Sequence, residues 1–377
     1  MQVVCHLCGK ENVLTLTQWR CDCGGALEPT LKHGFNIDLI NHNDYSLWRY
    51  GQELGLDISK PYKAMGVGWT PLVATKLFNR SVVLKLEYLM PSGSFKDRGV
   101  NAMINQLVHL DVKTVVEDSS GNAGASVAAH AACFGIHARI FVPSYASIFK
   151  QEQIAVYGAE IIAVSGTRKD TEQAAQDAIG EQVAYASHAY NPAYLSGQIT
   201  AAWELWEQLG QKSPDWIILP VAQGGQFLGY WFGFRKLLQA GLINRLPKLV
   251  AVQSSRIAPI YKAWLLNLDD VFPIEAKKST VAEGVAITNP VRGKRLLEAL
   301  RETNGKVLSI KEEDILRARK TLANKGFYIE PTSALAVAGF HQIRDEIKPG
   351  EQVVIPLTGS GLKGEPKQKK EKHAEID

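Results

Sequence analysis

Lys96 lies in the segment PSGSFKDRG, where one amine follows a run of small residues at the expected start of a helix. A lysine amine acts as a base, or forms a Schiff base with a carbonyl compound, only where its pKa is lowered. Phe95, the small neighbours and a helix N-terminus could supply the desolvation and positive potential that lower it. A solvated surface lysine fits the same composition, so the segment alone leaves both interpretations open.

Three glycine-bearing loops follow expected strands: SSGNAG (119–124), AQGGQ (222–226) and TGSG (358–361). Small residues between a strand and a helix let backbone N–H groups point at an anion, and the helix N-terminus adds partial positive charge. AQGGQ is the best candidate for a phosphate site, because two adjacent glycines permit close approach of the backbone. It matches neither the P-loop nor the dinucleotide-binding pattern. Each loop alone could equally be an ordinary strand–helix turn.

Four of the five cysteines fall within the first 23 residues, as Cys5, Cys8, Cys21 and Cys23. Two cysteine pairs at this spacing suit a tetrahedral zinc ion held between two short loops, and four protein ligands favour a structural role over a catalytic one. Four free thiols are the alternative. A disulfide framework is not indicated, because its cysteines would spread through a small secreted domain.

The elements that must position these residues alternate between short β-branched runs and helical stretches from about residue 81 to residue 360. Repeated strand–loop–helix units predict parallel sheets covered by helices, with a ligand cleft at the carboxyl ends of the strands. We therefore expect an α/β protein with two doubly wound parallel-sheet domains and a small N-terminal zinc-ribbon-like module. The expected divisions are a cysteine module (1–30), a segment wrapping the large domain (31–80), a small domain (81–190), a large domain (191–362) and a disordered tail (363–377).

Composition places the chain among globular proteins: 377 residues, 46% hydrophobic and 21% charged, with a net charge of +4. So small a charge gives no nucleic-acid footprint, and no apolar run approaches the roughly 20 residues that cross a bilayer. The N-terminus does not resemble a secretory signal. We expect a cytoplasmic protein whose partner is a small molecule, neither nucleic acid nor membrane.

The order of the motifs resembles that of the fold-type II pyridoxal-phosphate enzymes, the tryptophan synthase β-subunit superfamily. Within it the chain is most similar to the threonine synthases. The segments that carry the resemblance over roughly residues 1–363 are SLWRY, GWTPLV, SGSFKDRG, SSGNAGAS, YNP with the following SGQ, PVAQGGQFLG, EPTSALA and TGSGLK. Such proteins often carry a similar N-terminal cysteine element.

This resemblance implies roles for individual residues. Lys96, beside Phe95, would bond covalently to pyridoxal 5'-phosphate and later move protons at Cα and Cβ. Asn122 would bind the 3' oxygen of the cofactor, and Thr358 would meet its pyridine nitrogen. The backbone that would hold the cofactor phosphate belongs to Gln223, Gly224, Gly225 and Gln226. The residues expected near the substrate carboxylate are Ser94, Ser119, Ser120 and Asn122.

The sequence departs from the threonine synthase pattern at the expected substrate phosphate site. There the family has Asn-Ser-x-Asn-Pro-x-Arg, whereas this chain has HAYNPAY, so that His188 replaces the asparagine and Tyr194 replaces the arginine. A tyrosine offers one neutral hydrogen bond in place of a charged fork, and the loss should weaken binding of a dianion by about 2 kcal/mol or more. His188 and Tyr194 could instead recognise another side chain or leaving group.

The resemblance thus implies a lyase or synthase for a small amino acid with a β- or γ-leaving group, with threonine synthase as the best single assignment. The alternatives are a replacement or elimination enzyme, similar to cysteine, cysteate or diaminopropionate synthases or to threonine and serine dehydratases, and a non-catalytic cofactor- or metabolite-binding homologue. A homodimer is expected from the resemblance alone.

Overall fold

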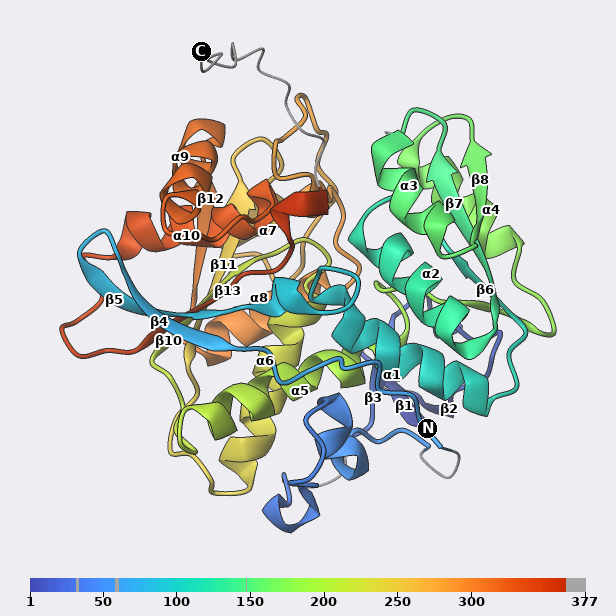
Figure 1. Ribbon diagram of the computed structural model, residues 1–377, viewed down its shortest axis with the longest axis horizontal. Helices are drawn as coiled ribbons and strands as arrows, with labels where there is room; N and C mark the ends of the chain where they lie inside the picture. The colour runs from blue at the N-terminus through green and yellow to red at the C-terminus, as the bar shows by residue number, and fades with distance from the viewer. Residues whose placement is uncertain (32–33, 58–60, 147, 364–377) are drawn as a thin grey trace, which may run out of the picture.

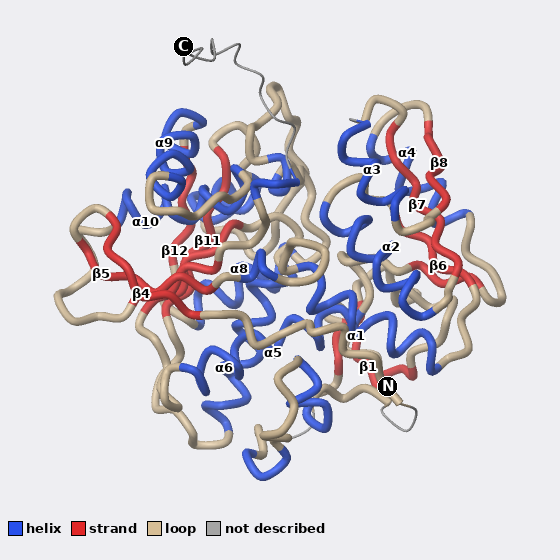
Figure 2. Tube along the Cα trace, viewed as in Figure 1, coloured by secondary structure: helices blue, strands red, loops and turns tan. Residues whose placement is uncertain are grey.

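The computed structural model describes residues 1–31, 34–57, 61–146 and 148–363, and within them one parallel and one mostly parallel sheet lie on either side of helix α1 (Lys96–His109). α1 packs against α5 of one half and α2 of the other, as Figures 1 and 2 show. The helix that begins at Lys96 therefore joins the two halves. The expected tail lies outside the described residues except for Lys363.

The smaller half is built on a four-stranded, all-parallel sheet in the order β8-β7-β6-β9. Its strands and helices are β6 (Thr114–Glu117), α2 (Asn122–Phe134), β7 (His137–Pro143), α3 (Ile148–Val156), β8 (Glu160–Val164), α4 (Arg168–Asp177) and β9 (Val183–Tyr185). Val115 packs with residues of α1 and α2, whereas its neighbour Val116 packs with Ala175 of α4. Consecutive strand residues face opposite sides, so both faces of this sheet are buried.

The larger half is built on a six-stranded sheet in the order β12-β11-β10-β13-β5-β4. Its elements are β4 (Leu72–Leu77), β5 (Arg80–Lys85), α5 (Pro192–Gln208), β10 (Trp216–Pro220), α6 (Gly225–Gln239), β11 (Lys248–Ser254), α7 (Pro259–Leu265), α8 (Gly293–Glu302), β12 (Lys306–Ile310), α9 (Glu312–Ala323), α10 (Pro331–Ile343) and β13 (Val353–Pro356). In β10, Ile217 packs in the core with α5 and α6, and Ile218 packs in the core with α9 and α10. This alternation buries both faces, as expected for parallel strands.

Strand β5 differs from the expected division, which placed residue 81 onward in the small domain. β5 pairs in parallel with β13, and β4 pairs antiparallel with β5 as the edge strand. Residues 81–85 therefore lie in the sheet of the larger half. The sequence hides this pairing because β13 lies about 270 residues further along the chain.

The N-terminal module, residues 1–30, carries a small antiparallel sheet of β1 (Gln2–Cys5), β2 (Glu11–Val13) and β3 (Leu27–Pro29). The remaining cysteine, Cys133, ends up exposed near the end of α2. No helix in the described ranges combines the length and apolar character that a bilayer crossing needs.

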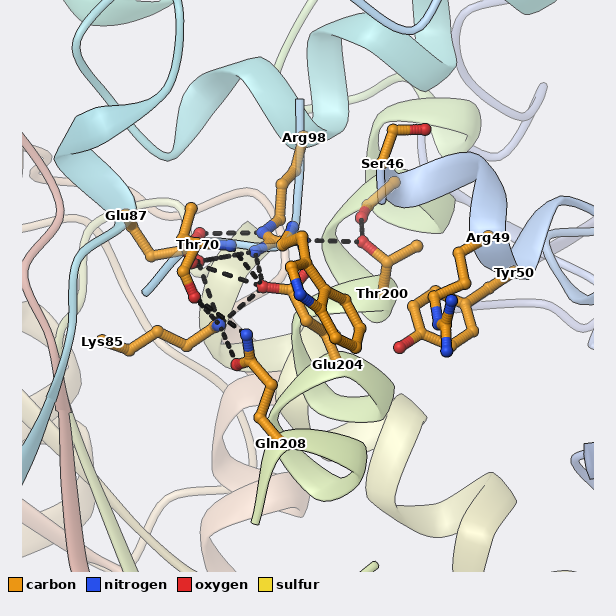
Figure 3. A network of polar contacts seen from close by, with 12 residues as sticks. Ser46, Arg49, Tyr50, Thr70, Lys85, Glu87, Arg98, Thr200, Glu204 and Gln208 are labelled. Atoms are coloured by element: carbon orange, nitrogen blue, oxygen red, sulfur yellow. Dashed lines mark hydrogen bonds and ion pairs between the residues drawn. The ribbon is translucent and has the colours of Figure 1, made fainter. Parts of the chain in front are cut away.

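A buried network of charges fixes α1 against the larger half (Figure 3). The Arg98 guanidinium donates to both oxygens of Glu87 at 2.7 and 2.8 Å and to both oxygens of Glu204, on α5, at the same two distances. Lys85 Nζ, at the end of β5, lies 2.6 Å from Glu204 Oε1. All four side chains are fully buried, and their two positive and two negative charges balance.

Thr70 closes this network, because its hydroxyl donates to Glu87 at 2.7 Å and its N–H donates to Glu204 at 2.9 Å. Burial alone would raise the pKa of Glu204, but Arg98 and Lys85 outweigh burial and hold that pKa at about 2. The carboxylate therefore stays charged, and the network depends on it.

We predict that Glu204→Gln lowers the free energy of unfolding by about 3–5 kcal/mol, because it leaves two buried cations short of a carboxylate. Urea denaturation of the purified protein measures this. The matched control is Glu313→Gln on α9, whose exposed ion pair with Arg317 stabilises by no more than about 0.5 kcal/mol. Equal effects of the two substitutions would contradict the role of the network.

Candidate active site

Lys96 is the first residue of α1 and is held beside the loop that follows β13. The N–H of Phe95 donates to the carbonyl of Thr358 at 2.9 Å, and Ser94 forms an isolated antiparallel bridge with Gly359. Gly93, at φ +81, makes the turn that precedes the helix. Two segments more than 260 residues apart in the sequence therefore place the lysine together with Thr358.

The surroundings of Lys96 make its amine easier to deprotonate than a solvated lysine. Burial lowers the pKa of Lys96 from 10.5 to about 8, although Glu117 and Glu330 act in the opposite direction. Its Nζ lies 4.6 Å from the centroid of the Phe95 ring and 6.0 Å from that of Tyr194. With such a pKa, about a tenth of the amine is neutral at pH 7 and available as a nucleophile or base.

The AQGGQ loop ends at the N-terminus of α6, where Gly224 adopts φ +83. Within the described part of the chain, no acceptor binds the N–H groups of Gly225, Gln226 and Phe227. The side-chain amide of Gln226 is also buried without a partner. A Cβ at Gly225 would lie 2.9 Å from a ring atom of Tyr194, so there is room only for glycine. Free N–H groups at a helix N-terminus fit a phosphate group.

Asn122 begins α2, and its Nδ2 donates to both carboxylate oxygens of Glu330, at 3.0 and 3.2 Å. Glu330 immediately precedes α10, so this contact connects the smaller half to the larger one. Ser119 and Ser120 lie half-buried in the loop between β6 and Asn122. Ser119, Ser120 and Asn122 thus follow the carboxyl end of the parallel strand β6, where α/β proteins bind ligands.

Thr358 is fully buried and its hydroxyl lies 2.9 Å from Ser333 Oγ on α10. Ser333 Oγ also accepts the N–H groups of Thr358 and Gly359, at 2.6 and 2.9 Å. Ser333 therefore holds the Thr358 hydroxyl and the neighbouring backbone in place. Ser94 Oγ, in contrast, is buried without a partner among the described residues.

Tyr194, near the start of α5, fills the space between α1 and α6. A Cβ added at Gly99 would lie only 2.3 Å from its ring. The tyrosine is buried, and no group in the ranges that the structure describes meets its hydroxyl with hydrogen-bond geometry, although the Gln198 side chain is close enough to act on its pKa. Burial raises the pKa of Tyr194 well above its usual value, with a further contribution from Glu117, so the hydroxyl keeps its proton.

His188 lies beyond the end of β9 and faces the neighbouring strand β6. Its Nδ1 is 2.8 Å from Oε1 of Glu117, the last residue of β6. Its ring centroid is 6.2 Å from that of Tyr194. Burial lowers the pKa of His188 well below its usual value, assisted by Lys96, so the imidazole is neutral.

Three residues that contact the predicted site residues are not assigned a role by any sequence motif: Glu117, Glu330 and Ser333. The segments that contain them, TVVED and EPTSALA, give a signal only through their position after a strand or before a helix. Their partners lie between 25 and 208 residues away, which no local pattern indicates.

The cysteine cluster belongs to the N-terminal module. The four sulfur atoms of Cys5, Cys8, Cys21 and Cys23 all lie within 4.8 Å of one another. A Cβ at Gly25 would come within 2.6 Å of the Cys5 sulfur, so the loop needs this glycine. The chemistry and convergence of these four groups fit a tetrahedral metal ion.

The module is docked on both halves of the protein. Arg292, immediately before α8, donates from Nη2 to the carbonyls of Leu27 at 2.8 Å and Tyr190 at 3.1 Å. Trp19 packs edge-on against the rings of Tyr185 and Tyr190. The module therefore contacts the segment that leads to His188 and Tyr194.

We predict that Gly99→Ala destabilises the protein by about 1–3 kcal/mol, because the new methyl group overlaps the Tyr194 ring. In a Tyr194→Ala background the same change should be neutral or stabilising by about 1 kcal/mol, since alanine favours a helix interior over glycine. Urea denaturation of the four proteins of this double-mutant cycle gives the coupling. An equal loss in both backgrounds would show that another contact restricts Gly99.

Comparisons with known proteins agree on one family. The family model described as pyridoxal-phosphate dependent enzyme matches residues 63–359. Threonine synthase of Methanocaldococcus jannaschii is 31% identical over 373 residues, covering 95% of this chain and 92% of that protein. Threonine synthase of Synechocystis sp. is 33% identical over 322 residues, covering 83% of this chain and 82% of that protein.

Two solved structures share the fold. A threonine deaminase from T.th. superposes with a TM-score of 0.65 at 25% identity, covering 77% of this chain and 92% of that one. Serine racemase from Dictyostelium discoideum gives a TM-score of 0.64 at 26% identity with the same coverage. The family match, from residue 63 to residue 359, includes Lys96 and the whole of the loops at 119–124 and 222–226.

Proposed function

Because the chain belongs to the pyridoxal-phosphate-dependent enzymes and is a lyase, we propose that it removes a leaving group from the β or γ carbon of a small amino acid. The observation that carries the proposal is the position of Lys96. Lys96 begins α1, and its amine has a pKa of about 8. The N–H of the preceding residue, Phe95, donates to the carbonyl of Thr358.

The residues around Lys96 fit the cofactor. The free N–H groups at the start of α6 would hold its phosphate, Asn122 would contact its 3' oxygen and Thr358 its ring nitrogen. When bound, pyridoxal phosphate supplies an electron sink for the charge that develops at Cα of the substrate. Phe95 would line this site beside the amine.

The chain's own residues would supply the proton transfers and the orientation. Lys96 Nζ would take the proton from Cα and return it, because its lowered pKa lets it exist in both protonation states near neutral pH. Glu330 would hold Asn122 in place through the two contacts with its carboxylate. Ser94, Ser119 and Ser120 would receive the substrate carboxylate.

Two reactions are candidates. Conversion of O-phospho-L-homoserine and water into L-threonine and phosphate is favoured by the similarity to a threonine synthase over 95% of the chain. Elimination from, or replacement on, a β-substituted amino acid is favoured by Tyr194, which is buried and uncharged at the position of the family's phosphate-binding arginine.

We predict that the purified protein carries pyridoxal phosphate on Lys96 and that Lys96→Ala loses the visible absorbance of the bound cofactor. Borohydride reduction followed by peptide mass spectrometry locates the attachment. Capture of the cofactor by cofactor-free protein should become faster as pH rises through about 8, because the neutral amine is the reactive form. Exposed Lys320 supplies the control variant Lys320→Ala.

Turnover separates the candidates. Threonine release from O-phospho-L-homoserine supports the first, and keto-acid release or replacement on serine, O-acetylserine, phosphoserine or threonine supports the second. Cofactor attached to Lys96 without turnover of any of these substrates would contradict both, and would indicate a binding protein that has kept the fold.

The four cysteines of the module support a structural zinc site, and we predict one zinc ion per chain, measured by elemental mass spectrometry. Cys8→Ser should lose the metal and lower the melting temperature, because binding free energy of a structural ion contributes to folding. Cys133→Ser, outside the cluster, should keep the metal. Metal-free protein of unchanged melting temperature would contradict the site.

A further inference from the structure

Glu117 is a buried carboxyl group whose second oxygen has no partner among the described residues. Oε1 meets His188 Nδ1 at 2.8 Å, whereas Oε2 is buried and makes no hydrogen bond in this part of the chain. The side chain is fully buried at the carboxyl end of β6. A buried acceptor without a partner is costly, which indicates that a ligand supplies the missing hydrogen bond.

Glu117 lies near enough to Lys96 for their charges to interact. Tyr194 connects the two, since its ring lies 6.2 Å from the His188 ring and 6.0 Å from Lys96 Nζ. The Tyr194 hydroxyl is also buried without a partner in the described ranges. Among the described residues, Glu117 Oε2 and the Tyr194 hydroxyl thus both lack a hydrogen-bond partner, and the Tyr194 ring lies beside the Lys96 amine.

Apart from Lys96, the positive side chains of this region are already engaged. Arg168 forms an ion pair with Asp118, and Lys363 Nζ donates to the carbonyl of Ser92 at 2.7 Å. His188 is neutral because burial and Lys96 lower its pKa. Asp97 and Glu330 add further acidic groups nearby.

As long as the His188 imidazole is neutral, the Glu117–His188 pair carries no positive charge. Burial and Asp118 raise the pKa of Glu117, although Arg168 and Lys96 act in the opposite direction. A donor or a cation bound at Oε2 would stabilise the charged form further. A hydroxyl group can donate to the carboxylate, and an ammonium group can donate and also neutralise it. A phosphate dianion beside the charged form of Glu117 would meet a like charge, and Arg168 is already paired with Asp118.

We propose that Glu117 is a specificity-determining residue, and that with His188 and Tyr194 it forms a subsite for an uncharged or cationic hydrogen-bond donor at the β or γ position of the amino-acid substrate, excluding phosphate esters. This rests on the proposed function, because the subsite is defined relative to the amine that carries the cofactor. It selects hydroxyl- or amine-bearing substrates over phosphorylated ones.

The test is a spectroscopic titration of the holoenzyme with matched ligands. L-Serine and L-homoserine form the hydroxyl arm, L-2,3-diaminopropionate the ammonium arm, and O-phospho-L-serine and O-phospho-L-homoserine the phosphate arm. We expect the wild-type protein to bind the hydroxyl or the ammonium arm at least about tenfold more tightly than the phosphate arm, as for one charged hydrogen bond. Equal or tighter binding of the phosphate arm overturns the proposal without any variant.

Glu117→Gln should strengthen binding of the phosphate arm about tenfold or more, because it removes the negative charge while keeping the size and the contact with His188. The hydroxyl arm should change by less than about threefold, and the ammonium arm should weaken, since only the ammonium group depends on the charge. Glu117→Asp, which keeps the charge, should retain discrimination against phosphate, and Glu313→Gln on α9 controls for a distant loss of charge. An unchanged ratio of the arms in Glu117→Gln overturns the proposal.

Failure of the proposed function is distinguishable from failure of this inference. Absence of cofactor on Lys96 in the wild-type protein would contradict the proposed function. Cofactor on Lys96 with preferred turnover of a phosphorylated substrate would contradict the subsite alone.

Discussion

Neutralisation of Arg98 inside the protein is the constraint on which the position of Lys96 depends. Arg98 follows Lys96 by two residues, and a buried guanidinium requires carboxylates with matching geometry. Glu87 and Glu204 provide these from the end of the β5 region and from α5. The start of α1 is therefore set by partners of the larger half, while the rest of the helix also packs on the smaller half. Lys96 lies where these two sets of contacts meet.

Close contacts through glycine then bring the remaining site residues together. Gly99 and Gly225 leave room for the Tyr194 ring between α1 and α6, and Gly197 lets α5 approach the carbonyl of Arg98. These contacts position a neutral aromatic group next to Lys96. The identity of residue 194 is thus coupled to the packing of three helices.

Much of this arrangement follows from the sequence, because alternating strands and helices with glycine loops are local signals. They indicate the α/β class, the helix at Lys96 and the loops at 119–124, 222–226 and 358–361, and the cysteine spacing indicates the cluster. The pairing of β5 with β13 and the contact between Glu117 and His188 do not follow, since each joins segments far apart in the chain. The sequence does not distinguish Glu117 and Asp118, in TVVED, from ordinary exposed acidic residues, because their burial depends on the fold. The comparisons establish the family, and the roles of individual site residues stay predictions.

Arg292 gives the cysteine module a thermodynamic connection to the smaller half. One guanidinium nitrogen is shared between the carbonyl of Leu27, in the module, and that of Tyr190, four residues before Tyr194. The preceding N–H, of Val291, donates to the Gln223 side chain in the AQGGQ loop. Any ligand that displaces the 188–194 segment must also alter how the module is held. By reciprocity, a ligand that changes the free energy of this contact between the module and the 188–194 segment has its own affinity changed by the contact, through the same coupling free energy.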